Sequence, residues 1–241
     1  MHAPHRIDLN ADIGEGGAWD EALFDGGISS VNVACGGHAG DAFTLATACA
    51  LAARHGVALG AHPGYADRAN FGRRERVLNP AELTGLMTGQ LQALSEAASR
   101  AGVPMAHVKP HGALYHFLHR DLAAAEACAR VVAAGWPNAA LVGLPEGEWR
   151  AAAAKVGLGY VAEGFLDRAY RADGTLVPRD QPGAVLTEET AVVAQALALA
   201  RGGRVRTLCV HGDGPDAVRF LRAARGALEA AGFTISAVRP E

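Results

Sequence analysis

VPMAHVKPHGALYH, residues 103–116, indicates both a type of fold and a place for chemistry. Its first half is short and apolar, which is typical of a buried strand. Pro110 marks the end of that strand, because proline cannot donate a hydrogen bond to a sheet. Lys109 and His111 flank this proline. We therefore expect their polar side chains to be presented at the strand end rather than buried.

The same alternation continues along the chain. Short apolar runs are separated by longer segments, rich in alanine and leucine, that have helical periodicity. This order is typical of βα units around a parallel sheet. The predicted strands are 6–10, 30–34, 57–61, 104–108, 139–144, 159–163 and 206–210, with a further candidate at 233–238.

Capping residues mark several helix starts. Asn79 precedes Pro80 and Glu82, a favourable N-terminal cap, and Gly102 closes that helix. Asp41 can cap a helix over 42–55, although a ligand contact is the alternative for its carboxylate. Further starts are predicted at Asp121, ahead of 122–134, at Thr187 and at Pro215.

Length and charge exclude several classes of function. The 241 residues, 50% of them hydrophobic, can form one large core, so we expect a single domain over 1–241. A formal net charge of −3 and a pI near 6.4 give no basic surface for nucleic acid or an anionic membrane. The N-terminal stretch lacks the apolar segment of a signal peptide, and no run is long enough to span a bilayer. A cytoplasmic location and a small-molecule partner are expected.

The cysteine spacing and the absence of a P-loop argue against several kinds of site. The four cysteines form no C-x-x-C pair, which argues against a zinc knuckle or a disulfide framework. Cys35 precedes Gly-Gly-His, but a small buried filler is a simpler interpretation than a nucleophile. The chain has no G-x-x-x-x-G-K-[ST] loop. If ATP takes part, we expect another fold or another chain to bind it.

Polar side chains collect directly after the predicted strands. The carboxyl ends of parallel strands converge in α/β folds, and ligands bind there. Six separate runs that supply one rim favour a barrel. The residues concerned are Asp12, Asn32, His38, Asp41, His62, Lys109, His111, Glu163, Asp167, Arg168, His211 and Asp213.

Eight blocks in the same order resemble the LamB/YcsF family. They are DLNADIGEG (8–16), NVACGGHAGD (32–41), GAHPGYAD (60–67), FGRR (71–74), HVKPHGALY (107–115), EGFLDRAY (163–170), LVPR (176–179) and CVHGDGP (209–215). The resemblance implies a distorted (β/α)7-type barrel of the glycoside hydrolase/deacetylase kind. It also implies ATP-dependent hydrolysis of 5-oxoproline to L-glutamate, as the A-type component of a 5-oxoprolinase that includes subunits B and C. Gly37 stands where this family has an aromatic residue, which predicts a looser pocket wall.

Opening a lactam requires a cation for the substrate carboxylate, a base for water and donors for the developing oxyanion. Lys109 is the candidate cation, with an ordinary surface lysine as the alternative. His62 and His111 are candidate acid/base groups or metal ligands, because imidazole titrates near neutral pH. Asp12, Glu15 and Asp213 are candidate bases, and a structural hydrogen-bond network is their alternative role. The predicted catalytic set is Asp12, His62, Lys109, His111 and Asp213.

Further residues are predicted to bind substrate. Arginines pair well with carboxylates or phosphate, although surface ion pairing is their ordinary role. Glu163 and Asp167 are expected to orient Arg168 or the substrate. Asp8 and Asn10 alternate with Ala11 and are expected to share the inward face of the first strand with Asp12. The predicted binding set is Asn10, Glu15, Asn32, His38, Arg74, Glu163, Arg168, Arg179 and His211.

Two other functions remain open at this point. The fold analogy allows a divalent-metal deacetylase or carbohydrate-acting hydrolase, in which Asp12, His38, His62 and His111 would be the metal ligands. A non-catalytic subunit that binds a lactam and delivers it to partners is the other possibility. The density of titratable groups favours an enzyme.

Overall fold

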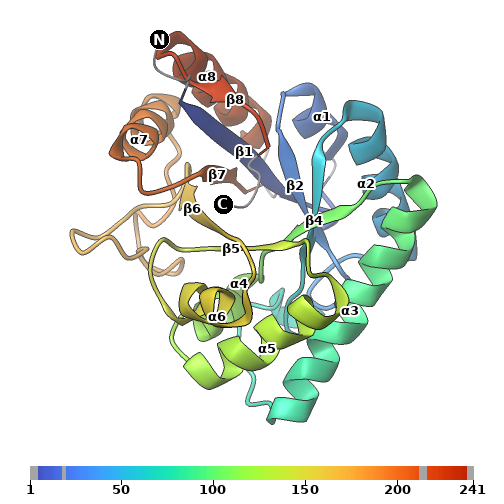
Figure 1. The fold of residues 1–241 in the computed structure, drawn as a ribbon. Helices are drawn as coiled ribbons and strands as arrows, with labels where there is room; N and C mark the ends of the chain where they lie inside the picture. Colours follow the sequence, from blue (N-terminus) through green and yellow to red (C-terminus); the bar gives the residue numbers. More distant parts are fainter. Residues whose placement is uncertain (1–4, 18–19, 212–215, 238–241) are drawn as a thin grey trace.

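A computed structural model describes residues 5–17, 20–211 and 216–237. Within them a parallel sheet closes on itself, because β1 pairs with β2 on one side and with β7 on the other. Figure 1 shows this barrel, with β1 in its wall between β7 and β2. Its strands are β1 (Arg6–Ile13), β2 (Ser30–Ala34), β3 (Ala58–His62), β4 (Met105–Val108), β5 (Ala140–Gly143), β6 (Tyr160–Phe165) and β7 (Thr207–Val210). The short β8 (Thr234–Ile235) pairs with the start of β1 outside the closed ring.

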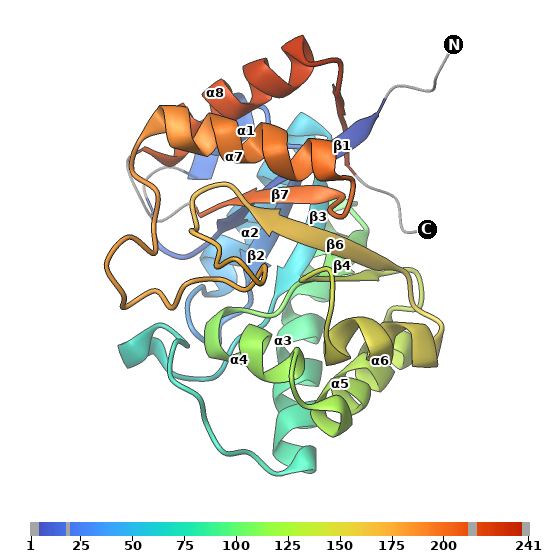
Figure 2. The same ribbon diagram turned by 90° about the vertical axis from the view of Figure 1, so that its left-hand side faces the viewer.

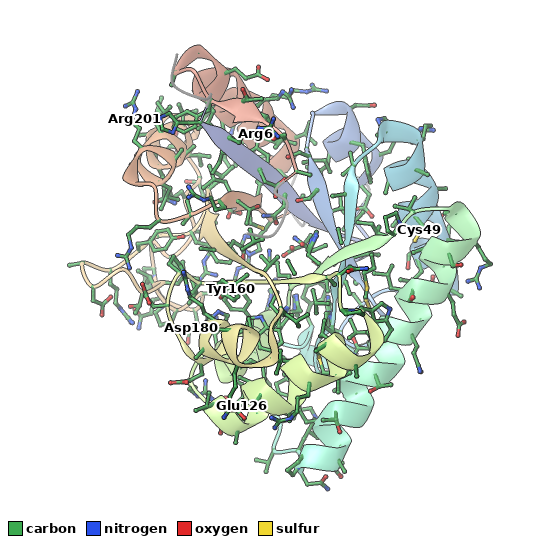
Figure 3. All side chains as sticks on the ribbon, in the orientation of Figure 1. Arg6, Cys49, Glu126, Tyr160, Asp180 and Arg201 are labelled. Atoms are coloured by element: carbon green, nitrogen blue, oxygen red, sulfur yellow. The ribbon has the colours of Figure 1, made fainter. Side chains whose placement is uncertain are left out.

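Helices surround the barrel and cover the outward faces of its strands (Figure 1). They are α1 (Asp20–Asp25), α2 (Ala42–His55), α3 (Pro80–Ala101), α4 (Gly112–Leu118), α5 (Leu122–Gly135), α6 (Glu148–Val156), α7 (Glu189–Gly202) and α8 (Ala217–Ala230), with a 3₁₀ turn at Arg68–Asn70. Side chains fill the space between strands and helices (Figure 3). The predicted barrel of seven strands is confirmed.

Alternation along β1 separates an apolar layer from a polar interior. Ile7 and Leu9 are buried in the main hydrophobic cluster, between the barrel and the helices. Asp8, Asn10 and Asp12 point the other way, toward the barrel axis, where they bond to side chains of other strands. The predicted shared inward face is confirmed. Next to β1 the barrel interior is therefore a hydrogen-bonded network, whereas small apolar side chains of β5 and β6 line its opposite side.

Local capping explains where the helices begin. The Asn79 side chain accepts a hydrogen bond from the backbone N–H of Glu82, and the Glu82 carboxylate accepts one from the backbone N–H of Asn79. Gly102 ends α3 in the left-handed region. Asp41 caps α2 as predicted. The helix predicted to open at Thr187 with Glu188 and Glu189 is present, but α7 begins at Glu189 and Glu188, not Thr187, is in the N-cap position. Pro215 lies outside the described residues.

The chemistry-bearing strand ends meet at one end of the molecule. Figure 2 shows β6 and β7 pointing toward the end where the long segments 63–79 and 166–188 lie. The predicted strands agree with the observed ones to within a few residues. Among the described helices, none combines the length and the hydropathy needed to cross a membrane.

Candidate functional site

A cavity of about 780 Å³ opens where the strands end. Its buried part is formed by residues from β1, β3 and β4 and the loops that follow them, and its outer part by the long loops. The buried lining includes Asp12, Glu15, His62, Lys109 and His111, and the outer lining includes Arg73, Arg120, Arg168, Arg179 and His211. The cavity is thus acidic and imidazole-rich at its base and arginine-rich toward its mouth.

Lys109 and His111 are both buried, with 2% and 7% of their surfaces exposed, so the prediction that they are presented rather than buried is wrong. The backbone of Lys109 lies at the end of β4, but its side chain turns into the barrel. Its Nζ donates to Asp12 Oδ1 at 2.9 Å, to Glu163 Oε1 at 2.8 Å and to Cys209 Sγ at 3.0 Å. Burial alone would lower the pKa of Lys109, but chiefly Asp12 holds it well above its usual value. All three donors of the ammonium are therefore in use.

Asp12 presents its two oxygens to different partners. Oδ1 accepts hydrogen bonds from Lys109 and from Asn32 Nδ2 at 2.8 Å. Oδ2 lies 3.4 Å from His62 Nε2. Burial alone would raise the pKa of Asp12, but His62 and Lys109 together hold it well below its usual value. Asp12 is consequently an ionised carboxylate with one oxygen fixed and the other beside an imidazole.

Three histidines and one glutamate form a compact cluster beside Asp12. The Oε1 atom of Glu15 lies 3.0 Å from His38 Nε2, 3.4 Å from His111 Nδ1 and 3.9 Å from His62 Nε2. The rings of His38 and His111 stack at 3.6 Å, almost parallel. One ligand atom from each of the four residues lies within 4.8 Å of every other. Burial lowers the pKa of His38 to about 2, so its ring is neutral.

The tautomers of two of these rings are set by backbone carbonyls. His62 Nδ1 lies 2.7 Å from the carbonyl oxygen of Lys109, and His111 Nε2 lies 2.9 Å from that of Phe71. Carbonyls only accept, so both of these nitrogens carry hydrogen. If both rings are neutral, the opposite nitrogens, His62 Nε2 and His111 Nδ1, carry no hydrogen. Their lone pairs then face each other, with the two nitrogens 3.0 Å apart. A proton or a cation between them removes this conflict.

Most of the predicted site residues meet, with informative exceptions. Arg74 is exposed and stands outside the cavity lining, and its neighbour Arg73 lines the cavity instead. Asn10 and Asn32 lie in the polar interior beneath Asp12. Asp213 lies outside the described residues.

Glu163 and Asp167 have partners other than the expected Arg168. Glu163 binds Lys109 and Asn10, whereas Asp167 accepts from His211 at 2.8 Å. Arg168 is itself buried and donates to the carbonyl oxygens of Val177 and Ala184. These backbone contacts, and not a carboxylate, orient its guanidinium at the cavity.

Sequence reasoning missed His107, Tyr115 and Cys209. His107 lies inside a segment that we interpreted as an apolar strand, yet its side chain faces the barrel interior, 2.8 Å from Asn32 Oδ1. A histidine two residues before Lys109 in a strand shares its inward face, and that alternation was the available signal. Cys209 and Tyr115 touch Lys109 and Glu163 respectively. No sequence spacing indicates these two contacts.

Gly37 does not loosen the pocket wall, contrary to the expectation from its departure from the family pattern. It is buried, and a Cβ built on it would lie 2.5 Å from the carbonyl oxygen of Gly64 and 2.6 Å from Gln90 Oε1. Gln90 closes this side by bonding both to the N–H and to the C=O of Gly64. An amide therefore occupies the space next to the glycine.

The sequence model of the LamB/YcsF family matches residues 7–241. The chain belongs to this family. A lactam utilization protein from Thermus thermophilus is 40% identical, with a TM-score of 0.89 over 97% of this chain and 100% of that one. The family model thus covers all eight sequence blocks that resemble the LamB/YcsF family.

More distant structures share the fold of this LamB/YcsF chain. The catalytic domain of a peptidoglycan N-acetylglucosamine deacetylase from Eubacterium rectale is 11% identical, with a TM-score of 0.56 over 99% of this chain and 90% of that one. The T48 deacetylase is 17% identical, with a TM-score of 0.52 over 96% and 87%. At these identities the likeness concerns the barrel alone.

The LamB/YcsF cluster has the donor set of a divalent-metal site. Three imidazole nitrogens and one carboxylate oxygen suit Zn²⁺ or a similar cation, and the carbonyls bonded to His62 and His111 orient the rings as outer ligands do in metal sites. The carboxylate in this cluster is Glu15. The expected ligand Asp12 instead lies to one side, bound to Lys109.

We expect Zn²⁺ to bind the purified protein at a ratio of about one to one and to raise its unfolding temperature. His38→Ala should weaken Zn²⁺ affinity by about tenfold or more, because it removes one nitrogen and leaves the carbonyl contacts of the other rings in place. Titration calorimetry measures both. His55→Ala, on the outer helix α2, is the matched control; equal Zn²⁺ affinities for the two variants would contradict the site.

Lys109→Met should lower the free energy of unfolding by about 3–5 kcal/mol at pH 8, because Asp12 and Glu163 lose their buried cation. Burial already raises the pKa of Glu163 above its usual 4.5, and losing Lys109 raises it further. A group whose pKa is raised in the folded protein destabilises that protein as pH rises above its usual pKa of 4.5, and has no such effect below it. Because the pKa of Glu163 is raised more in Lys109→Met than in the wild type, the difference in unfolding free energy between the two proteins should be smaller at pH 5 than at pH 8. Urea unfolding at the two pH values measures it.

Lys155→Met provides the control for this pH dependence, because Lys155 is the other lysine of the chain and pairs with Glu126 at the surface. It should cause a small loss that is nearly the same at pH 5 and pH 8. A deficit in Lys109→Met that is equally independent of pH would show that the buried charge balance is not its cause.

Proposed function

We propose that this chain is the A-type component of a three-component 5-oxoprolinase, which hydrolyses 5-oxoproline to L-glutamate with consumption of ATP. The observation that carries the proposal is the pair of Asp12 Oδ2 and His62 Nε2 at the base of a cavity, 3.4 Å apart, with Oδ1 fixed by Lys109. The 40% identity to a lactam utilization protein supports a lactam as the substrate.

Hydrolysis of a lactam needs a proton to leave the attacking water and another to reach the departing nitrogen. Asp12 is ionised and can accept the first at Oδ2. Burial alone would lower the pKa of His62, but Asp12 raises it, so the imidazolium can supply the second from Nε2. The two groups have the opposite protonation states that an acid and a base require.

The substrate carboxylate is assigned to Arg168 and not to Lys109. The three Lys109 donors are bound to Asp12, Glu163 and Cys209, which leaves none for a ligand. Arg168 faces the cavity with two of its nitrogens held by carbonyls, and a guanidinium so fixed suits a carboxylate. Lys109 then serves to hold Asp12 and Glu163 in place.

ATP is assigned to the partner subunits B and C, alone or jointly with this chain. The sequence has no P-loop, and the cavity base is acidic, which is unfavourable for a triphosphate. Phosphorylation of the lactam oxygen would make the ring carbon more electrophilic. Attack of water, followed by cleavage of the ring C–N bond with proton transfer to nitrogen, would give an acyl phosphate, and a second water would release phosphate to form glutamate.

The metal cluster favours a second candidate, an ATP-independent amide hydrolase that acts like a deacetylase. A cation held by Glu15, His38, His62 and His111 would supply a Lewis acid for an amide carbonyl. Asp12 would remain beside it as the base. Release of acetate from N-acetylated glycans by this chain alone, with Zn²⁺ and without ATP, would establish this candidate.

Asp12→Asn should lower the turnover of 5-oxoproline by roughly 100-fold to 10,000-fold, because the amide cannot accept the proton from water. The assay combines this chain with subunits B and C, 5-oxoproline and ATP, and measures glutamate. Asp25→Asn, at the surface end of α1, should have wild-type activity. Undiminished turnover in a folded Asp12→Asn variant would indicate that this chain only binds the lactam.

Arg168→Met should raise KM for 5-oxoproline by about 10-fold to 100-fold with a smaller change in kcat, because a charged hydrogen bond to the carboxylate is lost. Arg171→Met is the matched control, since Arg171 lies on the same loop, is exposed and stands outside the cavity lining. Parallel increases of KM in both variants would refute the assignment of the carboxylate to Arg168.

A further inference from the structure

One row of the barrel runs across four neighbouring strands at the level of Asp12. In register, Asp12 on β1 pairs with Asn32 on β2, Asn32 pairs with Gly60 on β3, and Gly60 pairs with His107 on β4. His107 Nε2 reaches across the glycine to Asn32 Oδ1 at 2.8 Å. Asn32 Nδ2 then donates to Asp12 Oδ1 at 2.8 Å. The row therefore ends on the carboxylate assigned to the reaction.

Every amide in this row has a forced orientation. Asn10 Nδ2 donates to Glu163 Oε1 at 3.3 Å, so the oxygen of Asn10 is free to accept from another side. Asn32 Nδ2 donates to that same oxygen at 2.7 Å. The Asn32 oxygen must then face His107, and it accepts only. The hydrogen of a neutral His107 ring is consequently on Nε2.

Gly60 makes the contact possible. A Cβ built on Gly60 would lie 2.0 Å from His107 Nε2 and 2.2 Å from Cδ2, so any side chain there would expel the ring. His107 is buried, with 7% of its surface exposed, and the burial lowers its pKa to about 3. The imidazole is thus a neutral donor that lies directly against a glycine and points at one amide oxygen.

We propose that His107 is a positioning residue for the opening of the lactam, and that it holds Asp12 in its orientation through Asn32. With Asn32 and Lys109 both bound to Oδ1, Oδ2 is the oxygen left for His62 and the cavity. Without His107, Asn32 Oδ1 loses its donor, and the amide is held only by the bonds of its Nδ2 to Asn10 and Asp12, which weakens its hold on Asp12. The kinetic part of this proposal rests on the function proposed above, whereas the geometric part does not.

The kinetic experiment compares His107→Leu with His107→Gln in the complete complex with subunits B and C, ATP and 5-oxoproline. Leucine removes the donor, and kcat should fall on the order of 10-fold to 100-fold while KM stays within about twofold. Glutamine carries an N–H at the equivalent reach and should restore most of kcat. Asn32→Leu combined with His107→Leu should be no slower than Asn32→Leu alone, because both act through the same amide.

Ser30→Ala is the matched control, since Ser30 lies in the same polar interior but bonds Asp8. It should leave kcat unchanged. Equal kcat values for His107→Leu and the wild type would overturn the role of His107 in the reaction. Equal losses in the leucine and glutamine variants would also overturn it, because they would indicate a purely structural role.

Two spectroscopic measurements test the geometry without any turnover. The ¹³C carboxyl resonance of Asp12 should move in His107→Leu and stay in place in His107→Gln and Ser30→Ala. In the wild-type protein, the ¹⁵N–¹H spectrum of His107 should show hydrogen on Nε2 alone. A stationary Asp12 resonance in His107→Leu, or hydrogen on Nδ1 of wild-type His107, would overturn the proposal even if the complex shows no lactam hydrolysis.

Discussion

The buried ammonium of Lys109 is the interaction on which the rest of the site depends. A closed barrel of parallel strands normally fills its interior with apolar side chains, but this one places carboxylates from β1 and β6 inside it. Two carboxylates cannot remain charged in such a place without a cation. Lys109 lies between Asp12 and Glu163 and makes the polar interior compatible with a folded protein.

This arrangement also divides the cavity into regions with different tasks. Because Lys109 is neutralised at the base, recognition of an anionic ligand falls to the arginines of the outer loops. Because Lys109 and Asn32 occupy one oxygen of Asp12, the other remains for His62. The Glu15 cluster on the far side of His62 is compact enough for a cation. In the proposed function, charge compensation, catalysis and substrate binding are thus carried by separate groups.

The sequence predicted the fold and the gathering of Asp12, His62 and His111, because strand ends in a parallel barrel must converge. It did not predict how far each side chain turns inward. Lys109 follows a strand and looked exposed, but four methylenes carry its charge to the axis. The choice between Arg73 and Arg74, and between Glu15 and Asp12 in the metal cluster, depends on loop geometry that local spacing does not encode. The inward position of His107 was not predicted, because its neighbours in 104–108 led us to interpret the segment as an apolar strand.

Closure of the ring through β1 sets the order in which the protein can assemble during translation. β1 ends at Ile13 and β7 begins at Thr207, so at ribosomal speeds of 5–20 residues/s about 10–40 s of synthesis separate the two edges that must join. Until then the nascent chain has an open sheet edge on β1, although Lys109, the partner of Asp12, has already been translated with β4. Because the first strand of the chain must pair with the last strand of the ring, the barrel can close only near the end of translation.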